Sequence, residues 1–303
     1  MQDLLVVYNT FGFKNNIEHY KECLNSIFNS DLPPKTRVII SSCMNSKECR
    51  DELQREYGDK LLHSYVDEGL PVNITFNLAV DRAVRLEGEF KYYLYVDSGV
   101  DFKGNEGAIL EATKVMDSDK YGILSFQASN DHALYNVGIH NPPLKGRNHE
   151  VPVGTACNGH SEMFSNAVRK RFRALIPDVF VAFCTESTFS FIAAAIGKRW
   201  VILGDYLLNH RKGVDGASSS VPHSSPKFGN TWNNLMFGRD ANQFIQDKEA
   251  YKVGLGYEEC NNIMNHDPNA YDSNGLPIDQ KALASKVEKY FYLTPSEFNY
   301  SSK

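Results

Sequence analysis

Four features that mark common classes of protein are missing from this sequence of 303 residues. No hydrophobic run is long enough to span a membrane, and the most apolar stretch, residues 189–196, is far too short. The six cysteines are scattered without a Cys-x-x-Cys pair, which argues against a zinc site and favours reduced thiols in a cytoplasmic protein. The net charge of −5 argues against binding to nucleic acid. The first ten residues have no basic segment before their apolar run, so we expect them to form a strand and not a secretion signal.

What is present favours a well-packed α/β protein. Hydrophobic residues make up 42% of the chain and charged residues 23%, enough for a sizeable core. Apolar runs typical of strands alternate with segments of helical periodicity in the first hundred residues. This alternation predicts a mainly parallel sheet with helices on both faces. The expected strands are 4–8, 37–40, 61–66 and 92–96, and the expected helices are 17–28, 45–57 with Asn45 as its N-cap, and 73–85.

The second half of the chain is less regular. Its pattern of apolar and polar residues predicts helices at 107–115, 162–175 and 186–196, strands at 122–127 and 200–203, and a polar loop from 210 to 226. We expect a catalytic domain at 1–222, made of a nucleotide-binding half at 1–102 and an acceptor half at 103–222. A C-terminal helical extension is expected at 223–303.

An acidic turn follows the fourth strand. Asp97-Ser98-Gly99-Val100-Asp101 begins where a buried strand ends, and a carboxylate there needs a cation or hydrogen-bond donors. Gly99 lets the chain turn sharply, so that Asp101 can come back toward Asp97. Two such oxygen donors suit Mg²⁺ or Mn²⁺ carrying a diphosphate. The alternative is an ordinary Asp/Gly turn.

Position in the sheet favours the functional interpretation. Ligands of parallel α/β sheets bind beyond the carboxyl ends of the strands. Thr10, Ser42 and Asp97 all lie at such ends and are expected to line one crevice.

Several motifs, in this order, resemble the inverting glycosyltransferases of family 2, which have the GT-A fold. The likeness spans roughly residues 4–210. The motifs are the first strand ending in Thr10, the segment Phe76-Asn77-Leu78-Ala79 with Ala83, the run Tyr95-Val96-Asp97-Ser98 into a D-x-D position, the pair Thr185-Glu186 opening a helix, and Gly197-Lys198-Arg199-Trp200-Val201 at a strand start.

The resemblance implies a metal-dependent, inverting transfer of one sugar from a nucleotide-sugar donor to an acceptor hydroxyl. The Gln-x-x-Arg-Trp signature of processive synthases is absent. The acceptor class stays open among glycans, lipid-linked acceptors and proteins. Glu186 takes the role of catalytic base, and Mn²⁺ or Mg²⁺ is held by Asp97, Asp101 and His210. The implied nucleotide-sugar-binding residues are Thr10, Phe11, Ser42, Asn77, Asp97, Ser98 and Lys212.

The sequence also departs from the family pattern. Ser41-Ser42-Cys43-Met44 replaces the Asp-Asp-Gly-Ser that normally supplies an acid to the base ring. Phe76 replaces an Arg, and Gly99 replaces the second acid of D-x-D.

Two alternatives to a glycosyltransferase are kept. A sugar nucleotidyltransferase normally has a Gly-rich loop after its first strand, where this chain has Gly12 and Lys14 without a G-x-G. An inactive nucleotide-sugar-binding module is suggested by Gly99. If Glu186 is not the base, Asp131 and Asp178 are the next carboxylates to consider.

Overall fold

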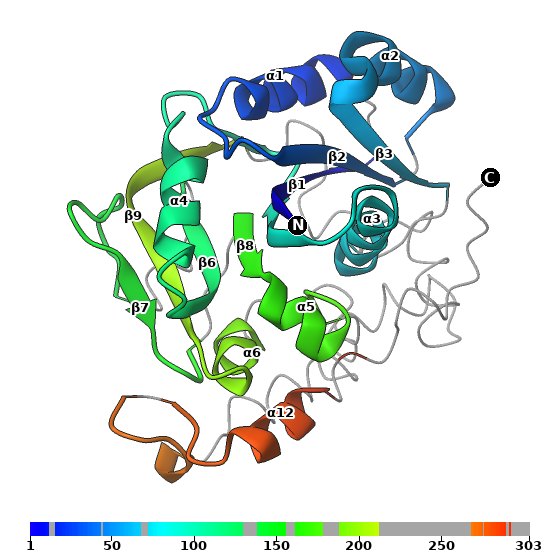
Figure 1. Ribbon diagram of the computed structural model, residues 1–303. Coiled ribbons are helices and arrows are strands. Elements are labelled where there is room, and N and C mark those ends of the chain that lie inside the picture. Colours follow the sequence, from blue (N-terminus) through cyan, green and yellow to red (C-terminus); the bar gives the residue numbers. More distant parts are fainter. Residues whose placement is uncertain are drawn as a thin grey trace, which may run out of the picture.

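The computed structural model of the protein describes residues 1–11, 16–43, 45–67, 72–129, 138–155, 161–177, 188–211, 268–274, 276–288 and 291. Strands and helices alternate through the first half as the sequence predicted (Figure 1). They are β1 (Gln2–Phe11), α1 (Ile17–Phe28), β2 (Thr36–Cys43), α2 (Lys47–Tyr57), β3 (Leu61–Val66), α3 (Val72–Glu87) and β4 (Phe90–Val96).

The second half adds shorter elements. They are β5 (Val100–Asp101), α4 (Ala108–Met116), β6 (Tyr121–Ala128), β7 (His149–Val151), β8 (Ser161–Ser165), α5 (Asn166–Phe172), α6 (Phe189–Ala195), β9 (Arg199–His210) and α12 (Gln280–Glu288). Within the described residues, no helix is long and apolar enough to cross a membrane.

One sheet runs through the molecule, with the strand order β3-β2-β1-β4-β8-β6-β9-β5 and β7 paired to β9. The pairs β3–β2, β2–β1, β1–β4 and β6–β9 are parallel. The strand β8 is antiparallel to both β4 and β6 and joins the two parallel parts. The carboxyl ends of β1, β2, β3 and β4 therefore meet at one edge, as required for the predicted crevice.

The predicted helix at 162–175 is wrong in its first turn. Residues 161–165 form β8, and the helix α5 starts only at Asn166. Within β8, Met163 packs in one core and Phe164 in the other, so the segment is buried on both faces. Its residues include no β-branched side chain, so their composition does not indicate a strand. The segment forms a strand because it pairs with β4 and β6.

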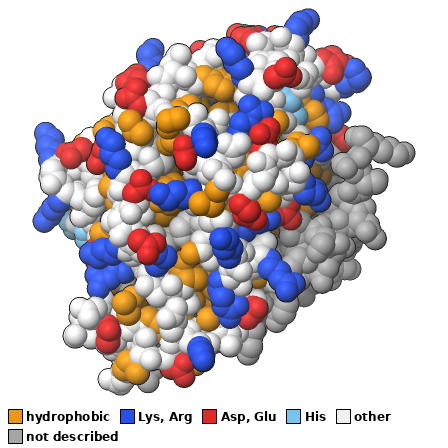
Figure 2. Space-filling model, viewed as in Figure 1, with side chains coloured by type: hydrophobic (Ala, Val, Ile, Leu, Met, Phe, Trp, Pro, Cys, Tyr) orange, Lys and Arg blue, Asp and Glu red, His pale blue; other side chains and the backbone are white. Residues whose placement is uncertain are grey.

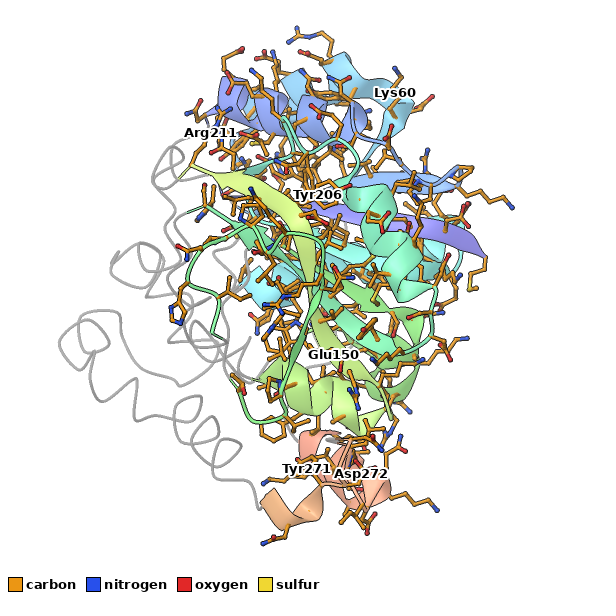
Figure 3. All side chains as sticks on the ribbon, turned by 90° about the vertical axis from the view of Figure 1, so that its left-hand side faces the viewer. Lys60, Glu150, Tyr206, Arg211, Tyr271 and Asp272 are labelled. Carbon is orange, nitrogen blue, oxygen red and sulfur yellow. The ribbon has the colours of Figure 1, made fainter. Side chains whose placement is uncertain are left out.

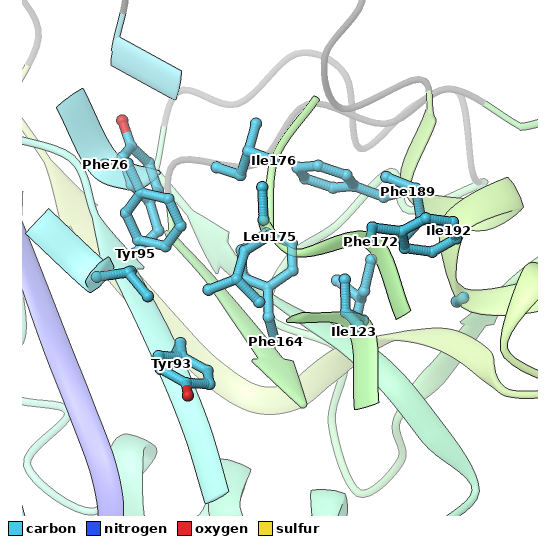
Figure 4. Packing of buried hydrophobic residues seen from close by; sticks show 14 of the residues in the cluster. Phe76, Tyr93, Tyr95, Ile123, Phe164, Phe172, Leu175, Ile176, Phe189 and Ile192 are labelled. Atoms are coloured by element: carbon cyan, nitrogen blue, oxygen red, sulfur yellow. The ribbon is translucent and has the colours of Figure 1, made fainter. Parts of the chain in front are cut away.

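Two hydrophobic cores flank the sheet. Side chains of α1, α2 and α4 cover one face. Side chains of α3, α5, α6 and α12 cover the other, where Phe76 and Tyr95 meet edge to face at 5.5 Å between ring centroids (Figure 4). Alternate strand residues supply each core, since successive side chains point to opposite faces. The predicted fold class, a mainly parallel Rossmann-like sheet with helices on both faces, is confirmed.

The described part of the C-terminal region packs at the end of the sheet away from Arg211. Figure 3 shows Tyr271 and Asp272 beyond Glu150, with Arg211 at the opposite end of β9. The helix α12 packs on α6, and Ala284 and Val287 are buried. A helix in the predicted extension is thus observed, while the domain boundaries at 102 and 222 stay predictions.

The surface carries charges of both signs. On the face in Figure 2, Lys and Arg are interspersed with Asp and Glu over the described residues, without a broad region of one sign. The expectation that the partner is not a nucleic acid stays a prediction.

Candidate active site

The acidic turn after β4 is held by hydrogen bonds to one carbonyl group. The carbonyl oxygen of Ser98 accepts from Tyr8 Oη at 3.1 Å, from His19 Nε2 at 2.8 Å and from Cys23 Sγ at 3.6 Å. Because a carbonyl oxygen only accepts, Nε2 of His19 carries the hydrogen. Burial raises the pKa of Cys23 to about 12, so its sulfur keeps the proton that it donates. The peptide between Ser98 and Gly99 is therefore fixed in one orientation.

The carboxylate of Asp97 lies at the mouth of this turn. Its Oδ1 accepts from the backbone N–H of Ser98 at 2.8 Å, and its side chain is 30% exposed. Its Oδ2 lies 3.9 Å from Nε2 of His210, at the carboxyl end of β9. The structure thus brings together Asp97 and His210, two of the three predicted metal ligands.

Gly99 explains how the imidazole of His210 comes so near. A Cβ at position 99 would lie 3.0 Å from Cδ2 and 3.1 Å from Nε2 of this ring. In a D-x-D motif the second acid would place its side chain here. In this chain the imidazole of His210 lies where a side chain at position 99 would be.

Asp101 does not join Asp97 and His210. It is 1% exposed, and its Oδ2 accepts from Arg211 Nε at 2.9 Å and from Asn209 Nδ2 at 3.1 Å. The pairing of β5 with β9 turns this carboxylate toward the strand partner instead of back toward Asp97. Within the described parts of the chain, no group of three or more His, Cys, Asp and Glu side chains is arranged to hold a metal ion.

Arg211, which immediately precedes the predicted binding residue Lys212, forms ion pairs with acidic side chains. Its guanidinium pairs with Glu22 of α1 as well as with Asp101, and its backbone N–H donates to the carbonyl of Gly99 at 2.8 Å. The hydrogen bond with Glu22, helped by the charge of Asp101, raises the pKa of Arg211. This arrangement fastens the end of β9 to the acidic turn.

A second polar group lies at the ends of β1 and β2. Asn45 Oδ1 accepts from Thr10 Oγ1 at 3.1 Å and from Ser42 Oγ at 2.6 Å. The sequence predicted Asn45 as the N-cap of α2, but the cap is Ser46, whose side chain accepts from the N–H of Cys49. Because the cap is one residue later, the side chain of Asn45 is free to bond to Thr10 and Ser42, and this is why sequence reasoning missed its role.

Asn77, predicted to contact the nucleotide sugar, bonds to the backbone. Its Nδ2 donates to Ile176 O at 2.8 Å, and its Oδ1 accepts from Leu175 N at 3.1 Å. Asn73, one turn earlier on α3, donates to Pro177 O at 2.6 Å. These amides anchor the chain just before the segment that contains Glu186.

The remaining predicted residues cannot be placed. Glu186 and Lys212 lie outside the described residues, as do the alternative bases Asp131 and Asp178. Phe11 ends β1, and its side chain is also outside them. Their roles stay predictions.

No family model matches the sequence, and no curated protein matches it. Solved structures do resemble it. S. aureus TarS 1–349 in complex with UDP aligns with a TM-score of 0.52 at 14% identity, covering 98% of this chain and 91% of that one. The same protein in complex with UDP-GlcNAc aligns with a TM-score of 0.51 at 17% identity, covering 85% and 78%.

Two further alignments complete the comparison. The chain spans 47% of the longer S. aureus TarS structure, at a TM-score of 0.51, 15% identity and 85% coverage of this chain. The mannosyltransferase PcManGT from Pyrobaculum calidifontis, in complex with GDP-Man and Mn²⁺, gives a TM-score of 0.49 at 13% identity, covering 97% and 90%, and adds no weight. At sequence identities this low, the alignments show a shared fold and nothing more. On the TarS alignments and the sheet topology, the chain has the GT-A-like fold of glycosyltransferases.

Proposed function

We propose that the protein is a glycosyltransferase that moves one sugar from a nucleoside-diphosphate sugar to an acceptor hydroxyl. The observation that carries this proposal is the fixed pair of Asp97 and His210 at the carboxyl edge of the sheet. In this fold, ligands bind beyond that edge. TarS, which shares the fold, was solved with UDP and with UDP-GlcNAc, and this supports a nucleotide-sugar donor here.

Asp97 and His210 fit a divalent cation. The Oδ2 of Asp97 and the Nε2 of His210 lie 3.9 Å apart. Adjacent ligands of an octahedral Mg²⁺ lie roughly 3.0 Å apart, so the two side chains would move about 1 Å closer together to hold the ion. A carboxylate oxygen and an imidazole nitrogen suit Mn²⁺ as well as Mg²⁺. Such a cation would neutralise charge on the departing diphosphate. Asp101 serves this site indirectly, by holding Arg211 against the turn.

Glu186 is the proposed base that takes the proton of the attacking acceptor hydroxyl. Direct displacement of the nucleoside diphosphate by this oxygen gives inversion at the sugar carbon. Support comes from the two ends of its segment. Asn73 and Asn77 fix the chain at residues 175–177, and the wholly buried helix α6 fixes it from Phe189 onward. The assignment of Glu186 therefore depends on its place in the sequence, just before the buried helix α6.

A cytoplasmic location is also proposed. The cysteines that the structure describes, Cys23, Cys43 and Cys49, are buried and form no disulfide, which suits a reducing compartment.

Turnover of donor sugars tests the proposal. The protein is incubated with Mn²⁺ and a panel of UDP- and GDP-sugars, with and without a panel of glycan, lipid-linked and protein acceptors, and the products are identified by chromatography. We expect slow release of nucleoside diphosphate by the wild type and none by Asp97→Asn. For Glu186→Gln we expect unchanged donor binding and transfer reduced by about 10²-fold, since the amide cannot take a proton.

Each alternative function gives a different product. Release of pyrophosphate from a nucleoside triphosphate and a sugar 1-phosphate, supplied in a separate incubation, would identify a nucleotidyltransferase. Donor binding without any product would identify a binding module. Normal transfer by Glu186→Gln would contradict the assignment of the base.

A further inference from the structure

Asn9 is a buried residue of β1 whose side-chain amide forms no hydrogen bond with the described residues. It is 5% exposed, and neither Oδ1 nor Nδ2 of its amide has a hydrogen-bond partner among the described residues. Among the described residues, the other buried amides each form at least one hydrogen bond, as Asn77 and Asn166 illustrate. An unpaired buried amide destabilises a fold, so its presence calls for a compensating function.

Asn9 lies at the same edge of the sheet as Asp97. In the parallel pair of β1 and β4, Tyr8 lies opposite Val96, the last residue of β4, and Asn9 and Asp97 follow these two residues in the sequence. Leu5 and Val7 belong to the core under α3, and the alternation of side chains puts Asn9 on that same face. On its other side, Asn9 is in register with Ser41 of β2, whose hydroxyl is already bonded to Thr75 O.

The chemistry of the amide narrows the ligand. A metal ion would satisfy only the carbonyl oxygen, and a phosphate would satisfy only the NH₂ group. A hydroxyl group both donates and accepts, and a pair of neighbouring hydroxyls satisfies both ends of an amide at once. The site lies one strand away from Asp97, the proposed ligand of the diphosphate-bound cation, so the sugar next to the diphosphate is within reach.

We propose that Asn9 binds the ribose hydroxyls of the donor nucleotide. This inference rests on the proposed function, since it requires a nucleotide beside Asp97. The amide is enclosed in the present arrangement and becomes available by a change of side-chain rotamer, which costs little for a group that gives up no hydrogen bond. Asn9 thus lowers the stability of the free protein and raises its affinity for the nucleotide.

Asn9→Leu tests both effects, because leucine has a similar size and needs no partner. Thermal unfolding is measured together with calorimetric titration of UDP and GDP in the presence of Mn²⁺. We expect a higher Tm than wild type and at least a 10-fold loss of affinity for the nucleotide. A merely structural asparagine would not give these opposite changes.

Asn166→Leu is the matched control. Asn166 is likewise buried, but its Oδ1 accepts from Tyr93 Oη at 3.3 Å at the other end of β4. Here we expect a lower Tm and unchanged nucleotide affinity.

Deoxynucleotides then identify the group that Asn9 contacts. The wild type should bind the 2′-deoxy or 3′-deoxy form of the preferred diphosphate about 10-fold more weakly, and Asn9→Leu should bind the ribo and deoxy forms equally. If Asn9→Leu keeps full affinity, or if the deoxy penalty persists in the variant, the ribose assignment is overturned. If the wild type binds no nucleoside diphosphate at all, the proposed function fails instead.

Discussion

Gly99 leaves the space that the imidazole of His210 needs to approach Asp97. An added methyl group at position 99 would press on the imidazole at 3.0 Å, and on Arg211 O at 3.2 Å. We therefore expect Gly99→Ala to displace the ring and to weaken binding of Mn²⁺ by roughly 10-fold or more, as changes around metal ligands commonly do. Titration with Mn²⁺ followed by electron paramagnetic resonance measures this affinity.

Gly107→Ala is the control for this prediction. Its added Cβ would meet Tyr206 Oη at 3.1 Å, a contact as tight as the one at Gly99 but at the start of α4. Its affinity for Mn²⁺ should equal that of the wild type. Equal affinities for all three proteins would show that His210 is not a ligand.

At the scale of elements, the helix α1 aims two side chains at the acidic turn. His19 and Cys23 are one turn apart on α1 and both reach the carbonyl of Ser98. We expect His19→Leu to lose a hydrogen bond worth about 1 kcal/mol and, with it, the fixed orientation of the turn. Metal-dependent affinity for a nucleoside diphosphate should fall about 5-fold, as measured by calorimetry.

A purely structural histidine would behave differently. His19→Leu would then lower the Tm and leave the affinity of the remaining folded protein unchanged. Glu18→Gln, on the exposed side of the same helix, should change neither quantity.

Helices and strands were predicted well where the spacing of apolar residues follows a single period, that of a helix or that of a strand. The strands β1, β2, β3 and β4 and the helices between them follow from apolar spacing, and their shared edge follows from the parallel pairing. The segment 161–165 was missed because pairing on both sides, and not its own composition, makes it a strand.

The candidate site was predictable only in part, for the same reason. Thr10, Ser42 and Asp97 are found from their places at strand ends. Contacts between residues far apart in the chain cannot be predicted from local sequence patterns. The carbonyl of Ser98 accepts hydrogen bonds from residues 75 to 90 positions away. The ion pair of Asp101 with Arg211 joins β5 to the end of β9. Asn9 gave no signal, because a single asparagine after an apolar run also suits an ordinary turn.

At the scale of the whole molecule, Glu150 links three strands to the C-terminal segment. Its carboxylate on β7 bonds to Lys120, to Tyr121 Oη at 3.0 Å and to Arg199 of β9, and Arg199 also donates to Asn274 O. Burial alone would raise the pKa of Glu150, but the hydrogen bonds from Lys120 and Arg199, with that from Tyr121, outweigh it and lower the pKa to about 2.

A carboxylate with a lowered pKa stabilises the folded state only while it is charged. Its contribution is complete above the ordinary value of 4.5 and is lost as the pH falls from there toward about 2. We therefore expect the Tm of the wild type to fall across this window more steeply than that of Glu150→Gln, which keeps the shape of the side chain without its titration. The two Tm values should differ most above pH 5 and converge near pH 2. Parallel Tm curves across the window would show that Glu150 does not link the acid stability of the sheet to the docking of the segment around Asn274.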